Sequence, residues 1–214
     1  MLFPIGDDQV KGGYFPLFSY AFILLNIAVY WQQMQHPDML VQQWGAVPAE
    51  ILRGECLLNL LTSMFLHSSL MHLIGNMLFL WVFADNIEAT IGNMRFLVFY
   101  LLGGLAAHFG HIYFNPTSLI HTIGASGAIA AVMGAYLVMF PTSRVKLWFF
   151  FLIFRVPAIL FLGVWIIMQW INGRASLEVY TADAGGTAWW AHIGGFAFGV
   201  LAGLYYRFSF REPL

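Results

Sequence analysis

The chain has few charged side chains and a single cysteine. Charged residues make up 9% of the 214 residues, hydrophobic residues make up 60%, and Cys56 has no second cysteine with which to pair. So little charge cannot cover the surface of a soluble domain of this length, and one cysteine excludes an intramolecular disulfide framework. The net charge of −1 gives no indication of a nucleic-acid partner. The composition therefore predicts a membrane protein, with the lipid bilayer as its surroundings.

Long apolar runs recur along the chain, each close to the length that a helix needs to cross about 30 Å of hydrocarbon. Residues 147–154 are also apolar, but Arg155 and Pro157 follow them, so we interpret this stretch as an interfacial or extended approach to the fifth helix. Nothing indicates a second domain, so residues 1–214 are predicted to form one all-α membrane domain, a bundle of six transmembrane helices with a short N-terminal segment, 1–16. The predicted spans are about 17–34, 66–84, 95–113, 124–141, 156–171 and 189–207.

The basic residues are distributed unevenly between the two sides of such a bundle. Seven of the nine fall on the side of the termini, and only Arg53 and Arg174 fall on the other. The positive-inside rule therefore places both termini in the cytoplasm and the loops 35–65 and 172–188 on the extracytoplasmic side.

Three polar residues on different spans are predicted to lie at the same depth. Ser126 and His192 each stand 15 residues before the cytoplasmic end of their span, and His72 stands 13 residues before Asp85. At 1.5 Å per residue these separations correspond to about 20–22 Å. The three side chains should therefore meet about 8–10 Å below the outer edge of the hydrocarbon.

Small residues at helical spacing favour close contact between the fourth and sixth spans. Gly195, Gly199 and Gly203 form a double GxxxG pattern, and the fourth span carries Gly127 and Gly134 on one face. Such faces let two helix backbones approach closely in lipid, which would bring Ser126 and His192 within hydrogen-bond distance.

These residue types favour nucleophilic catalysis. A serine hydroxyl becomes a good nucleophile when a base removes its proton, and His192 is the candidate base. No acidic residue lies at this depth, so we expect a dyad of Ser126 and His192. His72 and Asn76 share a helix face at i, i+4, and together with the Ser126 backbone N–H they would stabilise an oxyanion. The loop 172–188, with Gly173, Gly185 and Gly186, is a candidate mobile cover.

Three motifs together resemble the rhomboid family of intramembrane serine proteases. They are His67-Ser-Ser-Leu-Met-His72-Leu-Ile-Gly-Asn76, Gly124-Ala-Ser126-Gly127 and Ala191-His192-Ile-Gly194-Gly195. Glu88, Gly92 and Arg95 also resemble the acidic and basic loop that follows the second helix of the family.

The resemblance implies Ser126 as nucleophile, His192 as general base, and His72 and Asn76 at the oxyanion site, with His67, Gly124 and Gly127 in supporting roles. It implies single-span membrane proteins as substrates and no metal or organic cofactor. The sequence departs from some family members at Ala130, where an aromatic residue would stack on the histidine, so Trp189 or other packing must orient His192. The compact form favours a prokaryotic plasma membrane and an active site open to the extracytoplasmic side, and it leaves the oligomeric state open.

Other readings of these residues remain. A catalytically silent rhomboid-like protein would bind membrane clients, but that class typically lacks the serine or the histidine. A proton-coupled transporter would also use intramembrane histidines, but it should carry carboxylates at the bilayer midplane. His67 and His72 have the wrong spacing for a metal pair on one helix face. His108 and His111 are interpreted as an interfacial polar cap rather than as metal ligands.

Overall fold

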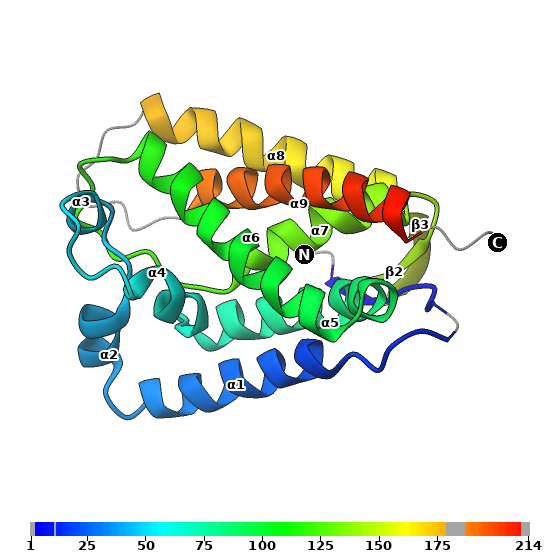
Figure 1. Ribbon diagram of the computed structural model, residues 1–214, viewed down its shortest axis with the longest axis horizontal. Helices are drawn as coiled ribbons and strands as arrows, with labels where there is room; N and C mark the ends of the chain where they lie inside the picture. Colours follow the sequence, from blue (N-terminus) through cyan, green and yellow to red (C-terminus); the bar gives the residue numbers. More distant parts are fainter. Residues whose placement is uncertain (1–2, 11, 179–186, 211–214) are drawn as a thin grey trace.

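The computed structural model describes residues 3–10, 12–178 and 187–210, and within these residues the chain is mostly helical (Figure 1). The long helices are α1 (Leu17–Gln33), α5 (Leu70–Ile91), α6 (Asn93–Phe114), α7 (Ser126–Met139), α8 (Ala158–Glu178) and α9 (Trp189–Ser209). They correspond in position to the six predicted spans. Among the described residues, α5, α6 and α8 are long and apolar enough to cross a membrane by length and composition.

Helix α5 differs most from its prediction, because it begins at Leu70 rather than 66 and continues to Ile91 rather than ending at 84. Its first turn is capped by Ser69, whose hydroxyl accepts from the His72 N–H. The helix continues past Asp85 because its polar residues there have partners inside the protein. The carboxylate of Glu88 is fully buried and accepts the N–H groups of Phe18 and Ser19 at 2.8 and 2.7 Å, so it caps α1.

The predicted loop 35–65 contains four short helices instead of irregular chain. Proline starts two of them, where its missing N–H is not needed by the helix. The four are α2 (Pro37–Trp44), α3 (Pro48–Leu52), α4 (Asn59–Thr62) and the 3₁₀ helix η1 (Ser63–Phe65).

The all-α prediction is wrong in one respect, because the chain also forms a small antiparallel sheet in the order β1-β2-β3. The strands are β1 (Phe3–Gly6), β2 (Arg144–Phe149) and β3 (Leu152–Pro157). The stretch 147–154 was predicted to be an interfacial or extended approach to the fifth helix. It is extended, and it folds back on itself as the hairpin of β2 and β3. Inward-facing Val145 and Leu147 are buried, which gives β2 an apolar face against the helices.

The N-terminal segment is held against the same end of the bundle. The Tyr136 hydroxyl donates to the Asp7 carboxylate, and Asn86 Nδ2 donates to it at 2.7 Å. Burial raises the pKa of Asp7 to about 6, the hydrogen bond from Tyr136 opposes this rise, and the nearby charge of Asp85 adds to it.

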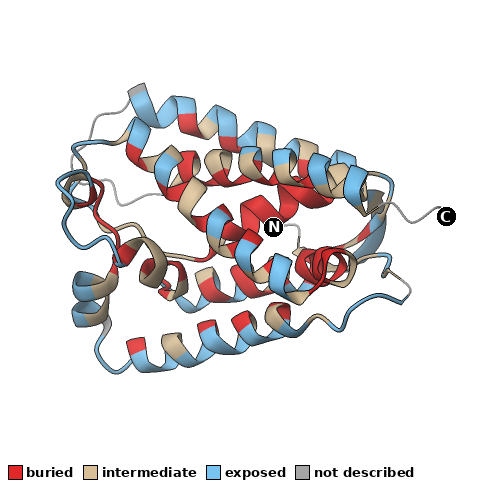
Figure 2. Cartoon of the chain, in the orientation of Figure 1, coloured by how far each residue is buried: buried red, intermediate tan, exposed pale blue. Residues whose placement is uncertain are grey.

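The core is centred on α7, which packs against α5, α6, α8 and α9. Every residue of α7 from Gly127 to Tyr136 is buried, whereas α8 exposes most of its surface (Figure 2). This arrangement places the first residue of α7 inside the helical bundle.

Candidate active site

Ser126 is the first residue of α7, and the segment before it is fixed by the protein. Gly124 has φ +124°, a conformation that favours glycine, and its N–H donates to the Ser63 carbonyl at 2.9 Å. A Cβ on Gly124 would lie 2.9 Å from Cε1 of His72, so the glycine also makes room for that ring. The serine hydroxyl and its N–H are therefore presented at a helix N-terminus beside His72.

The structure brings Ser126 and His192 together. His192, on the first turn of α9, is buried, and its Nε2 lies 2.8 Å from Oγ of Ser126. The small faces of α7 and α9 make this possible, because a Cβ on Gly195 would overlap the carbonyl of Gly127, and one on Gly199 would overlap that of Ala131. The predicted close contact of these two helices is confirmed.

A glutamine that was not among the predicted site residues completes the arrangement. Gln169 of α8 is 6% exposed, and its Oε1 lies 2.7 Å from Nδ1 of His192. An amide oxygen only accepts hydrogen bonds, so Nδ1 carries the proton and Nε2 is free to accept from Ser126. The hydrogen-bonded series is therefore Ser126–His192–Gln169.

Two tryptophans lie near the imidazole of His192. The Trp165 ring is tilted at 37° to it with centroids 5.7 Å apart, and Trp189 stands edge-on at 6.3 Å. The suggestion that Trp189 contacts the ring is therefore supported, and Trp165 contributes a second contact. Ala130 itself is fully buried in the core.

His72 and Asn76 line the other side of Gly124. The Ser68 N–H donates to Nδ1 of His72 at 3.5 Å, which leaves the proton of that ring on Nε2, the atom that lies beside Gly124. Asn76 Nδ2 lies 2.9 Å from Nε2 of the fully buried His67, so it uses one of its two protons there and keeps one. Two donors thus lie next to the segment that precedes Ser126.

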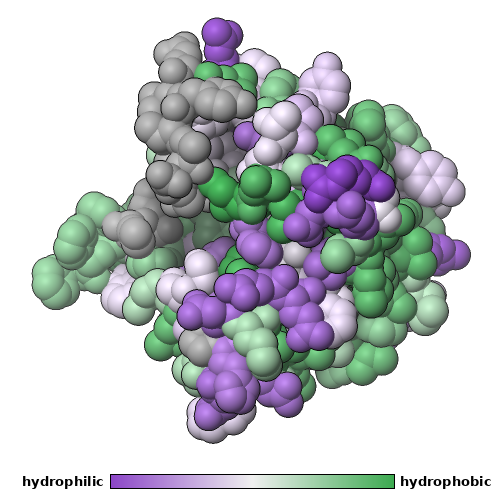
Figure 3. Space-filling model, turned by 90° about the vertical axis from the view of Figure 1, so that its left-hand side faces the viewer, coloured by the Kyte–Doolittle hydropathy of each residue, from purple (hydrophilic) through white to green (hydrophobic). Residues whose placement is uncertain are grey.

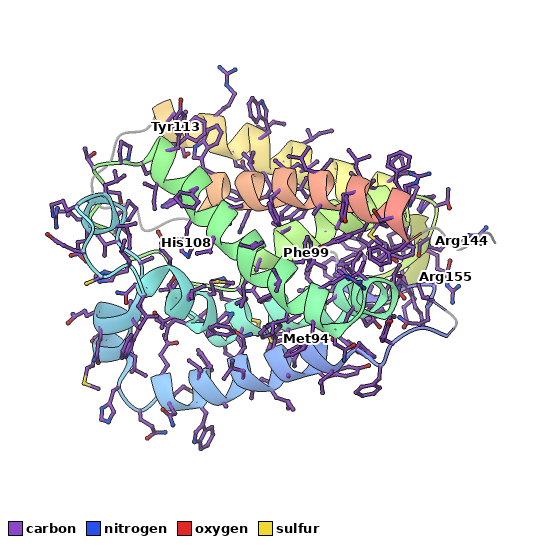
Figure 4. The ribbon with its side chains drawn as sticks, in the orientation of Figure 1. Met94, Phe99, His108, Tyr113, Arg144 and Arg155 are labelled. Atoms are coloured by element: carbon purple, nitrogen blue, oxygen red, sulfur yellow. The ribbon has the colours of Figure 1, made fainter. Side chains whose placement is uncertain are left out.

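Two further contacts hold this side of the site in place. The Gln33 side chain, at the end of α1, donates to the His67 carbonyl at 2.7 Å and accepts from the His67 N–H at 3.0 Å. His108 is buried, with Nε2 3.1 Å from the Ser63 hydroxyl, and the interfacial cap stays a prediction. His108 is labelled on α6 in Figure 4, and the Ser63 hydroxyl is its partner inside the protein.

A cavity of about 20 Å³ opens beside Ser126, and Gly124, Gly127 and His108 are among its lining residues. This volume is enough for one water molecule with polar partners. Gly127 also brings α6 close to α7, because a Cβ there would overlap that of Ala107. Within the described residues, no three His, Cys, Asp or Glu side chains are arranged to hold a metal ion.

The segment before Ser126 is joined to the end of the molecule that carries α2 and α3 (Figure 1), because Thr122 pairs with Ala46 between those two helices. Seen from that end, hydrophilic side chains gather over the middle of the surface and apolar ones lie toward its sides (Figure 3). Of the predicted mobile cover 172–188, residues 172–178 form the end of α8, and residues 179–186, with Gly185 and Gly186, lie outside the described residues.

The family model of the Rhomboid domain matches residues 54–208. The mitochondrial Rhomboid protein 1 of Saccharomyces cerevisiae is 26% identical over 196 residues, covering 87% of this chain and 52% of the relative. Presenilin-associated rhomboid-like protein A, a mitochondrial protein of Danio rerio, is 31% identical over 189 residues, covering 83% and 45%.

A bacterial relative, the putative rhomboid protease YdcA of Bacillus subtilis, is 33% identical over 123 residues, covering 56% of this chain and 61% of its own length. The chain spans about half the length of the mitochondrial relatives it matches. The family match covers most of the chain and includes Ser126, His192, His72 and Asn76. The chain belongs to the rhomboid family.

Proposed function

We propose that this protein is an intramembrane serine endopeptidase that cleaves single-span membrane proteins in or near their transmembrane segments. The observation that carries the proposal is the 2.8 Å contact between Nε2 of His192 and Oγ of Ser126 at the N-terminus of α7. A serine hydroxyl and an unprotonated imidazole nitrogen at this distance are a nucleophile and its base.

In the proposed reaction, His192 takes the hydroxyl proton while Oγ of Ser126 attacks the scissile carbonyl carbon. The negative charge that develops on the carbonyl oxygen is stabilised by the Ser126 N–H, His72 Nε2–H and the second proton of Asn76. His192 then gives its proton to the leaving amine, and an acyl-enzyme remains. Water activated by His192 attacks the acyl carbon, and the carboxylic acid product leaves as the serine hydroxyl re-forms.

We further propose that all six long helices span the bilayer, with both termini cytoplasmic and the site open to the extracytoplasmic side. The distribution of basic residues supports this orientation. The prokaryotic plasma membrane stays a proposal, because relatives of this chain include both mitochondrial and bacterial proteins. Neither catalysis nor substrate class requires a metal or an organic cofactor in this scheme.

The test is covalent labelling of the purified full chain with a fluorophosphonate, which reacts with activated serines and needs no known substrate. The wild type should be labelled, and Ser126→Ala and His192→Ala should not. Ser176→Ala is the matched control, because Ser176 is an exposed serine of α8 whose hydroxyl donates to the Gly173 carbonyl at 2.7 Å. A folded wild type that resists labelling would refute the activated serine and favour the silent, client-binding reading.

Cleavage then identifies the reaction. Wild type reconstituted with a single-span substrate should yield two fragments whose masses place the cut in or near the span. Proton flux through liposomes that is abolished by His72→Ala, without any proteolysis, would instead favour the transporter reading.

A further inference from the structure

The β2–β3 hairpin has one face that the protein covers and one that it does not. Val145 and Leu147 of β2 are buried, and Val156, the cross-strand partner of Val145, packs against the core. Strand side chains alternate between faces, so the residues between these point away from the helices. The hairpin is therefore anchored by one face and presents the other.

The uncovered face carries basic side chains near the base of the hairpin. Lys146 lies directly opposite Arg155 in the register, and Arg144 is on the same face two residues earlier. Like charges at opposed positions destabilise a sheet unless an anion lies between them. Arg155 has one ion pair, at 3.5 Å from Asp8, and within the described part of the chain Arg144 and Lys146 have none.

The tip of the hairpin is aromatic and points away from the protein. Phe151 is 99% exposed and Phe150 is 69% exposed. Trp148 lies between this tip and the basic residues, and its indole N–H donates to the Phe150 carbonyl at 2.6 Å. Basic residues, then tryptophan, then apolar residues is the order in which side chains enter a bilayer from its headgroups.

The hairpin also lies beside a helix that is apolar enough to cross a membrane. β3 ends at Pro157 and α8 begins at Ala158, without a connecting loop. Arg144 and Arg155 lie together at the end of the molecule where α8 starts (Figure 4). A bilayer crossed by α8 would therefore have its headgroups at the level of these basic side chains.

We propose that the hairpin is a lipid-binding anchor, in which Arg144, Lys146 and Arg155 bind anionic phospholipid headgroups and Phe150 and Phe151 insert among the acyl chains. The occupant is the leaflet on the side where α8 begins, because three cations that share the one carboxylate of Asp8 complement anionic headgroups and the tip complements hydrocarbon. This inference concerns a surface at the opposite end from Ser126 and does not depend on proteolysis.

The first test measures the depth of the tip. In a Cys56→Ser background, Phe151→Cys is labelled with the fluorophore NBD and the full chain is placed in nanodiscs. Gln9→Cys is the matched control, because it is an exposed position outside the hairpin and next to Asp8, whose carboxylate accepts from Arg155. Lipid with a nitroxide near the top of its acyl chain should quench NBD at 151 and not at 9, while aqueous iodide should do the reverse.

Iodide quenching at position 151 equal to that at position 9 would overturn the insertion of the tip. Protection from both quenchers, as burial against a second protein chain would give, would also overturn it.

The second test measures headgroup preference, using spin-labelled phosphatidylglycerol and phosphatidylcholine as quenchers of the same probe. The wild type should prefer phosphatidylglycerol, and Arg144→Gln and Lys146→Gln should each lower that preference about fivefold. Arg53→Gln, whose side chain pairs with Glu55 in the segment between α3 and α4, is the control. An unchanged preference in the Arg144→Gln, Lys146→Gln double variant would refute the headgroup contact.

Discussion

Replacing Gln169 with leucine removes the acceptor for Nδ1–H of His192 and keeps a side chain of similar size. In the wild type, Gln169 Oε1 lies 2.7 Å from His192 Nδ1 and both residues are buried, so bulk water cannot easily replace the amide oxygen. The variant should fold, because α8 exposes most of its surface and Gln169 has no other side-chain partner among the described residues. The effect should fall on catalysis instead.

The magnitude follows from the charge that His192 gains. When the imidazole takes the proton of Ser126 it becomes a cation, and a hydrogen bond to a charged group contributes about 1.5–3 kcal/mol. The leucine variant lacks this hydrogen bond when His192 is charged, so the activation free energy rises by about 1.5–3 kcal/mol. A rise of this size lowers kcat by about 10- to 150-fold. Binding of substrate does not involve this contact, so KM should change little.

The assay is kcat and KM on a reconstituted membrane substrate, together with the rate constant of fluorophosphonate labelling. Gln169→Glu keeps an acceptor in the same place and should recover most of the rate lost in Gln169→Leu, and Ser176→Ala should match the wild type. If Gln169→Leu retains full kcat, or if Gln169→Glu is impaired equally, the glutamine does not position His192 and the reasoning fails.

Three other changes test separate parts of the structure. Gly199→Ala should force α9 away from the Ala131 carbonyl and abolish labelling, whereas Gly163→Ala, which meets nothing within 4 Å, should leave it unchanged; equal labelling of both would contradict the helix contact. Asn76→Ala should lower kcat by about 10²–10³ with little change in Tm, and an unchanged kcat would remove Asn76 from the oxyanion site. Asp7→Asn tests pH dependence. The pKa of Asp7 is about 6 in the folded chain and 3.8 in the unfolded chain. The stabilisation from protonated Asp7 is therefore complete below about pH 4 and disappears as the pH rises through 6. The Tm of the wild type relative to Asp7→Asn should therefore fall from pH 4 to 7, by the equivalent of about 1–2 kcal/mol after solvent screening, and a constant difference would refute the raised pKa.

The meeting of Ser126 and His192 was predictable because it follows from two regular properties, helix rise and small residues at helical spacing. The contact of Gln169 was not, because one glutamine in an apolar helix carries no periodic signal and its direction depends on the rotation of α8. The sheet was also missed. Strand β1 (Phe3–Gly6) lies about 140 residues before its partner β2 in the sequence. No local sequence pattern encodes a pairing at that distance.

The predicted end of the second span is wrong because polar residues beyond it have partners inside the protein. The second span was predicted to end before Asp85 because charges usually mark the edge of hydrocarbon, yet Glu88 is satisfied by the first turn of α1. His108 likewise has a partner inside the protein, the Ser63 hydroxyl. A boundary drawn from hydropathy assumes that a polar side chain must reach water. A folded chain can instead supply the hydrogen-bond partner from a distant segment.

Helix α1 is attached at both of its ends to residues of α5 or to the segment before α5, and these contacts determine how much of the chain supports the site. Glu88 holds its first turn, and Gln33 at its last residue holds both backbone groups of His67, which in turn orients Asn76. The family match begins at residue 54, after α1 has ended. Without the residues that precede the family match, the buried carboxylate of Glu88 and both backbone groups of His67 would lose these hydrogen-bond partners, so the segment outside the family match is part of the support behind Asn76.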